Sequence, residues 1–148
     1  MAPESAATPT LKLRAEDEED LAVISTILQD ALVLVGEMAF LAEEKRFALV
    51  ANRFCWECKP CDGGKLFERT LTGIAFEAVE AVKTRGFDRT ERDRILEVLA
   101  VRGVPGAVVF DFSGAASMRL EVGRILCHLE DLGEPWPTSW RPHHPLEE

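Results

Sequence analysis

The stretch that decides the fold is Val33-Leu-Val-Gly-Glu-Met-Ala-Phe-Leu-Ala-Glu-Glu-Lys-Arg-Phe-Ala-Leu-Val-Ala-Asn-Arg-Phe-Cys-Trp56. Its β-branched and aromatic residues alternate with polar ones, which is typical of strands. The polar turn Ala42-Glu43-Glu44-Lys45 divides it into two segments, residues 33–41 and 46–56. The second segment has apolar residues on both faces, Val50, Phe54 and Trp56 on one and Phe47 and Leu49 on the other. We therefore predict a β-hairpin.

Five more segments downstream have the same strand-like composition, which brings the number of predicted strands to seven. They are residues 66–78, 79–87 (after a bend near Glu77), 95–102, 107–112 and 117–122. The last three are separated by Gly103-Val-Pro-Gly106 and Ser113-Gly-Ala-Ala116, which are good turn formers. Consecutive short strands with tight turns predict a mostly antiparallel sheet.

Helical periodicity occurs on both sides of these strands. An acidic run at residues 16–20 precedes apolar residues spaced at three and four: Leu21, Ile24, Ile27, Leu28, Ala31 and Leu32. Acidic residues at the start of a helix interact favourably with its dipole, so we predict an N-terminal helix here. A second set with helical spacing is Val122, Ile125, Leu126, Leu129 and Leu132, and Gly133 follows as a C-cap.

This order of elements predicts an α+β fold with an N-terminal helix, about seven short strands, a closing C-terminal helix and an extended tail. Two architectures fit: a pleckstrin-homology-like barrel plugged by the last helix, or a two-layer sheet packed on two helices. We expect a flexible N-terminus at residues 1–10, one domain at residues 11–133 and a proline- and tryptophan-rich tail at residues 134–148. The tail's Trp136 and Trp140 either pack on this domain or enter a partner's groove.

The composition narrows the class of protein. The chain has 148 residues, of which 47% are hydrophobic and 29% charged, the balance of an ordinary globular domain. Its net charge of −9 repels phosphate backbones and anionic membrane surfaces, so we expect neither nucleic acid nor membrane as a partner. No apolar run approaches the roughly 20 residues of a membrane span, and the first residues lack a signal-peptide pattern. A cytoplasmic location is expected.

Three cysteines form the most unusual motif of the chain. Cys55, Cys58 and Cys61 are spaced so that their thiols can converge on one point. Thiolate clusters bind zinc or iron–sulfur, which usually take four ligands, and Cys127 is the candidate fourth, with His128 beside it. Two other interpretations remain open: ordinary core or surface thiols without chemistry, or a redox-active dithiol.

No catalytic residue is assigned from the sequence. Nucleophilic catalysis by Ser or Cys needs a nearby base, and the histidines are His128, His143 and His144, the last two in the tail. The leading hypothesis is a non-enzymatic cytosolic binding or scaffold module for an unknown protein or small-molecule partner. The alternative is a metal or redox role for the cysteine cluster. The sequence leaves the oligomeric state open.

Several stretches resemble one bacterial family. They are residues 11–21, 47–54, 82–88 and 141–145, and the most specific is Leu129-Glu-Asp-Leu-Gly-Glu-Pro-Trp136. Together they resemble domain-of-unknown-function family 2948, found mainly in Alphaproteobacteria. The resemblance implies no reaction, cofactor or catalytic residue. It also implies that the loop after Trp56 needs no cysteine trio, so the cluster is not a family signature.

Overall fold

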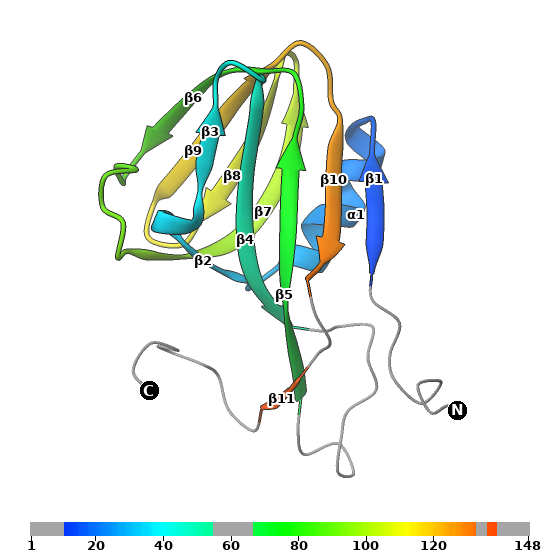
Figure 1. The fold of residues 1–148 in the computed structure, drawn as a ribbon, viewed down its shortest axis with the longest axis vertical. Helices are drawn as coiled ribbons and strands as arrows, with labels where there is room; N and C mark the ends of the chain where they lie inside the picture. Colours follow the sequence, from blue (N-terminus) through cyan, green and yellow to red (C-terminus); the bar gives the residue numbers. More distant parts are fainter. Residues whose placement is uncertain (1–10, 55–66, 133–135, 139–148) are drawn as a thin grey trace.

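The strands of the protein build one curled antiparallel sheet. The computed structural model describes residues 11–54, 67–132 and 136–138. Within them lie an α-helix, a short 3-10 helix and eleven strands (Figure 1). In chain order they are β1 (Lys12–Ala15), α1 (Glu18–Leu28), β2 (Leu32–Leu34), η2 (Val35–Glu37), β3 (Ala39–Leu41), β4 (Arg46–Phe54), β5 (Phe67–Phe76), β6 (Val79–Arg85), β7 (Ile95–Val104), β8 (Ala107–Phe112), β9 (Ala116–Val122), β10 (Cys127–Asp131) and β11 (Trp136–Thr138).

The path of paired strands through the sheet ends at β1 on one side and at β6 on the other. Its strand order is β1-β10-β5-β4-β2-β7-β8-β9-β6, while β3 pairs with β4 and β11 with β5. In Figure 1, β3, β4 and β5 stand in front of β7, β8 and β9. The rings of Phe76 on β5 and Phe110 on β8 meet edge to face, with centroids 5.8 Å apart. The two halves of the sheet therefore face each other across one hydrophobic core.

Helix α1 packs between β1 and β7 and contacts both. Asp17 caps its first turn by accepting a hydrogen bond from the Asp20 amide at 2.8 Å. Leu21, Ile24 and Leu28 are buried, so the apolar stripe of the helix faces the core. The Ser25 hydroxyl accepts a hydrogen bond from the Val101 amide at 2.9 Å. This bond attaches the helix to the part of β7 that does not pair with β2.

Several of the sequence predictions are confirmed. The acidic run does precede a helix, and β3 and β4 pair around the polar turn at residues 42–45. The bend expected near Glu77 separates β5 from β6, with Ala78 at a φ of 58°. The strand predicted at residues 107–112 is β8. The flexible N-terminus expected at residues 1–10 lies outside the described residues.

The predicted closing C-terminal helix is wrong. Residues 127–131 form strand β10, which pairs with β1 on one side and β5 on the other. Its buried residues, Cys127, Leu129 and Asp131, alternate with the exposed His128 and Glu130. The sequence contains this two-residue period, but the pattern is difficult to recognise because the inward residue at position 131 is an aspartate. The apolar residues at 122–132 matched a helix because their spacing also fits a 3.6-residue period.

The overall architecture also differs from the prediction. The described residues form eleven strands where about seven were expected, and their α-helix is N-terminal. A pleckstrin-homology-like barrel plugged by its last helix, or a sheet packed on two helices, is therefore not this fold. Tertiary pairing decided the difference, because β10 becomes a strand by adding to β5 and β1 by adding to β10.

Two further local predictions are corrected. The single strand expected at residues 33–41 is interrupted by η2, where the backbone turns at Gly36. A Cβ at Gly36 would lie 2.9 Å from the Arg92 carbonyl oxygen, so only glycine allows this close approach. The tail was expected to lack regular structure, yet its residues 136–138 form β11 and pair with residues 67–69 of β5.

Two glycines allow a test of the turns. Gly86 and Gly106 both have positive φ, 81° and 76°, but only Gly86 is crowded: a Cβ there would lie 2.7 Å from the Ala115 carbonyl oxygen. Gly106→Ala should lower the free energy of unfolding by about 1–2 kcal/mol, the usual strain of this conformation. Gly86→Ala should lower it further, because the clash adds to the strain. Chemical denaturation measures both, and equal losses would contradict the packing at Gly86.

Candidate functional site

A buried polar network lies on the inner face of the sheet, where β4, β5 and β10 end. On β4 the inward residues Phe47, Leu49 and Ala51 are buried and apolar, and the next inward residue is Arg53. Arg53 is 0% exposed, and the side chain of Asp131 on β10 is 1% exposed. A buried charge is costly unless it is paired and hydrogen-bonded, so each of these two side chains depends on the other.

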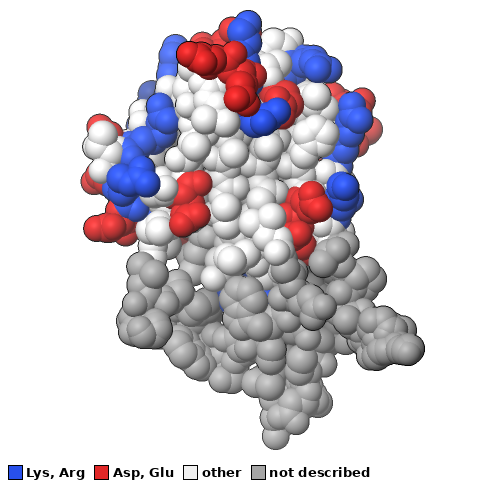
Figure 2. Space-filling view, viewed as in Figure 1, with Lys and Arg blue, Asp and Glu red and all other residues white. Residues whose placement is uncertain are grey.

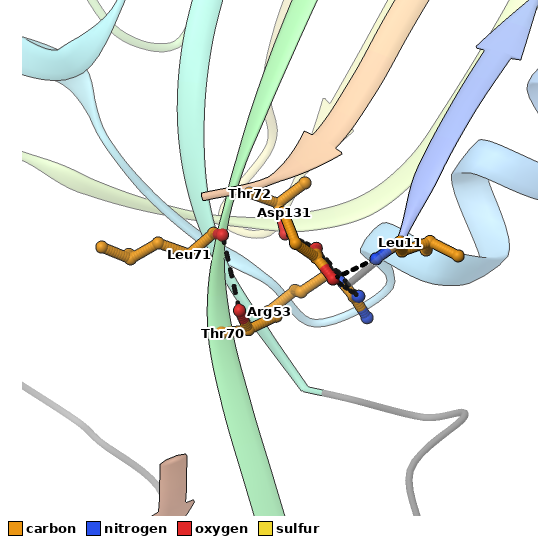
Figure 3. A network of polar contacts seen from close by, with 6 residues as sticks. All are labelled: Leu11, Arg53, Thr70, Leu71, Thr72 and Asp131. Atoms are coloured by element: carbon orange, nitrogen blue, oxygen red, sulfur yellow. Dashed lines mark hydrogen bonds and ion pairs between the residues drawn. The ribbon is translucent and has the colours of Figure 1, made fainter. Parts of the chain in front are cut away.

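Both oxygens of the Asp131 carboxylate accept hydrogen bonds in this network (Figure 3). Arg53 Nη2 donates to Asp131 Oδ1 at 3.0 Å and to Oδ2 at 2.9 Å. The Thr72 hydroxyl accepts from Arg53 Nε at 2.9 Å and donates to Asp131 Oδ1 at 2.8 Å. The backbone amide of Leu11 donates to Asp131 Oδ2 at 2.9 Å. The Asp131 amide in turn donates to the Leu11 carbonyl, so both ends of this contact are fixed.

This arrangement holds the sheet together and leaves the carboxylate no free lone pair aimed at a substrate. Its members come from β4, β5, β10 and the residue just before β1, which are far apart in the chain. Within the described residues, no buried side-chain nitrogen or oxygen lacks a hydrogen-bond partner. A saturated, solvent-excluded ion pair is a structural element, and the surface it supports lies on the other side of the same strands.

Arg69 belongs to that other, outer face of β5. Its Nε donates to Asn52 Oδ1 at 2.6 Å and its Nη2 to the Asn52 carbonyl oxygen at 2.7 Å. Burial lowers the pKa of the Arg69 guanidinium to about 10, while the nearby Asp30 carboxylate acts in the opposite direction. Arg69 stays protonated at neutral pH, and it fixes the Asn52 side chain in one orientation.

The outer face is unusually apolar over the middle of β4 and β5. Cross-strand partners there are Leu32, Asn52 and Leu71 in one row, Val50 and Gly73 in a second, and Ala39, Ala48 and Ala75 in a third. On the neighbouring strands these rows continue with Glu97, Glu130 and His128, respectively. Leu71 is 42% exposed and points away from Arg53 and Asp131 in Figure 3. Leu132, 58% exposed, extends over Gly73, where a Cβ would be 3.3 Å from its methyl group. Antiparallel sheets normally turn polar residues to solvent on such a face.

A groove crosses this face. Its volume is about 210 Å³, and it is lined by Leu32, Leu34, Glu37, Val50, Asn52, Leu71 and Ile95. Figure 2, drawn from the same side as Figure 1, shows an uncharged band running down the front over β4 and β5, with charged side chains on both sides. Five aliphatic side chains thus form the floor, while Glu37 and Asn52 provide the polar groups. We call these seven residues the outer groove.

The predicted metal ligands are not brought together by the described residues. Cys55, Cys58 and Cys61 lie outside them, as do His143 and His144. Cys127 is fully buried and pairs with Phe76 at one end of the β4–β5 ladder, whereas Phe54, which precedes the trio, pairs with Arg69 at the other end. His128 is exposed on the outer face of β10. The described residues contain no group of three or more potential metal-binding side chains, and the cysteine cluster stays a prediction.

Sequence reasoning missed both the ion pair and the outer groove. The available signal for the groove was the composition of β4 and β5, whose outward positions include Ala48, Val50, Gly73 and Ala75. Strands that are apolar on both faces indicate a sheet covered on both sides. No comparable signal marked the ion pair, because which aspartate meets Arg53 depends on strand pairing.

The ion pair can be tested by removing its negative charge. Asp131→Asn should lower the free energy of unfolding by about 3–5 kcal/mol, because it leaves the Arg53 charge buried without its partner. Replacing both residues by apolar ones, Arg53→Met with Asp131→Leu, should recover much of this loss. Chemical denaturation provides the comparison.

A matched control for that experiment is Glu80→Gln. It breaks the ion pair of Glu80 with Lys45, whose side chains are 53% and 59% exposed. Exposed pairs contribute about 0–1 kcal/mol, so its effect should be small. Equal losses for Asp131→Asn and Glu80→Gln would show that the buried pair does not constrain the sheet.

The thiol of Cys127 should be unreactive in the folded protein. Burial raises its pKa to about 12, so the reactive thiolate is scarce at pH values well below this, and the side chain is also shielded from solvent. Iodoacetamide at neutral to mildly alkaline pH should leave Cys127 unmodified in the native state and alkylate it once guanidinium unfolds the chain. Peptide mapping by mass spectrometry separates Cys127 from the other cysteines. Equal rates in both states would contradict its burial.

Comparison with known proteins identifies the family. The family model described as "Protein of unknown function (DUF2948)" matches residues 11–144, nearly the whole chain. No curated protein matches the chain, and no solved structure does. None of the helices in the described residues is long and apolar enough to cross a membrane. The resemblance seen in the sequence is thus confirmed, and the chain belongs to the DUF2948 family of proteins of unknown function.

Proposed function

We propose that the protein is a non-enzymatic cytoplasmic binding module, and that its partner covers the outer face of β2, β4 and β5. The observation that carries this proposal is the outer groove together with the small, uncharged residues above it, Ala48, Gly73 and Ala75. Exposed apolar patches on soluble domains mark interaction sites, because burying them against a partner is favourable.

The chemistry of the outer groove supports binding over catalysis. Its lining consists of five aliphatic side chains, one carboxylate and one amide. General acid–base or nucleophilic catalysis needs a reactive group placed beside a second, activating group. An apolar floor with a few polar groups at its margin instead resembles the anchor region of a protein–protein interface.

The rigidity of the supporting strands favours the same function. Arg53 on β4 and Thr72 on β5 are tied to Asp131 on the inner face, directly behind Asn52 and Leu71 on the outer face. Arg69 also fixes the Asn52 side chain. Sites built on strands with locked side chains present a preformed surface, so less entropy is lost when a partner binds.

Site-specific photo-crosslinking tests this proposal. A photoreactive phenylalanine analogue is placed at Leu71, 42% exposed in the outer groove, and at Val23, 53% exposed on helix α1. In living cells, Leu71 should give the same discrete adduct in repeated preparations, and Val23 should not. Equal adducts at both positions would contradict the assignment of the face. Reproducible turnover of any compound in a metabolite panel by the purified protein would contradict the non-enzymatic part.

A further inference from the structure

We infer that the partner contributes a peptide segment in which a large apolar side chain lies next to a lysine or arginine. This inference rests on the proposed function and names the chemistry of its partner. The apolar side chain would fill the aliphatic floor of the outer groove, and the cation would pair with Glu37 at its margin. The peptide backbone would meet Asn52 on the other side of the floor.

Glu37 is held in place by its backbone. It ends η2, whose residues are anchored by hydrogen bonds from the Val35 amide to the Arg94 carbonyl and from the Gly36 amide to the Arg92 carbonyl, both at 2.9 Å. The Glu37 side chain is exposed and makes no ion pair with any described residue. The nearby Arg92 guanidinium donates to the Gly36 carbonyl oxygen at 3.0 Å. The carboxylate is therefore available to a cation from outside.

Asn52 offers the complementary group. Its Oδ1 already accepts a hydrogen bond from Arg69 Nε at 2.6 Å. The other polar group of this groove-lining side chain is its amide NH2, which is a donor and suits a peptide carbonyl oxygen. The groove thus has an acceptor at Glu37, an aliphatic floor and a donor at Asn52, which together match a basic and apolar peptide.

Two other occupants fit less well. A second copy of the chain would bring a second Glu37 and another net charge of −9 to an interface that already carries the same sign. Like charges brought together across an interface oppose association. A small molecule is also disfavoured, because a volume of about 210 Å³ is below the usual 300–1,000 Å³ of ligand pockets. The small residues Ala48 and Ala75 follow Val50 and Gly73 on the same face, which suits an extended contact.

Selection from a library of random linear peptides displayed on phage tests the inference. The full chain is the bait, and parallel selections use Glu37→Lys, the control Glu43→Lys in the turn before β4, and Leu71→Asn. Circular dichroism and thermal melting confirm that each variant is folded. We expect the wild-type protein and Glu43→Lys to enrich peptides with Lys or Arg beside Leu, Phe or Trp. Glu37→Lys should lose the preference for basic residues, and Leu71→Asn should enrich no peptide.

The affinity of one enriched peptide then gives a quantitative reading by fluorescence polarisation. Glu37→Gln should weaken binding by about 2- to 5-fold, the size of an exposed ion pair, and Glu43→Gln should leave it unchanged. Added salt should weaken wild-type binding and affect the Glu37→Gln variant less, because salt screens the ion pair between Glu37 and the peptide, which this variant cannot form.

The possible outcomes separate the inference from the proposed function. Peptides that need Leu71 but show no basic preference, or bind Glu37→Lys equally, would overturn the inference and leave the binding module standing. No enrichment above the Leu71→Asn background would overturn the inference, and the absence of a discrete crosslinked adduct at Leu71 would overturn the proposed function. A dimer in sedimentation experiments that Leu71→Asn dissociates would assign the outer groove to a second copy and overturn the peptide partner.

Discussion

The buried ion pair between Arg53 and Asp131 is the constraint on which the sheet depends. It sets the register of β10 against β5, because Asp131 must lie opposite Thr72 to reach both Thr72 and Arg53. A slip by one residue would turn Glu130 inward and Asp131 outward. Replacing a buried ion pair by apolar residues is often neutral for stability. We therefore attribute to the Arg53–Asp131 ion pair mainly the selection of one strand register among several.

The same strands connect this constraint to the surface. Side chains alternate along β4 and β5, so fixing Arg53 and Thr72 inside also fixes Asn52 and Leu71 outside. When an antiparallel sheet has apolar residues on both faces, the hydrophobic core of the domain covers only one of them. The second layer of the sheet covers the inner face, through contacts such as Phe76 with Phe110. We propose that a partner covers the outer face, and this is the physical basis of the proposed function.

Local sequence signals predicted some elements and misled on others for identifiable reasons. Helix α1 was predictable because its cap, its acidic first turn and its apolar stripe all lie within a few residues of one another. Strand β10 was not, because Leu126 and Leu129 fit a helical spacing and the inward Asp131 looked like a solvent-facing residue. Its partners, β1 and β5, come from distant parts of the chain. Likewise, the outer groove combines residues from β2 to β7 that no short motif unites.

The sequence by itself determined the class of protein: a small acidic domain, rich in strands, with an N-terminal helix that follows an acidic run and the hairpin of β3 and β4. It also determined the family, since residues 11–144 match it. The tertiary structure alone decided that Arg53 meets Asp131, that β10 is a strand, and that Glu37, Val50 and Leu71 share one groove. The reason is that propensity and capping act within one turn or hairpin, whereas strand partners and shared faces depend on contacts between residues far apart in the chain.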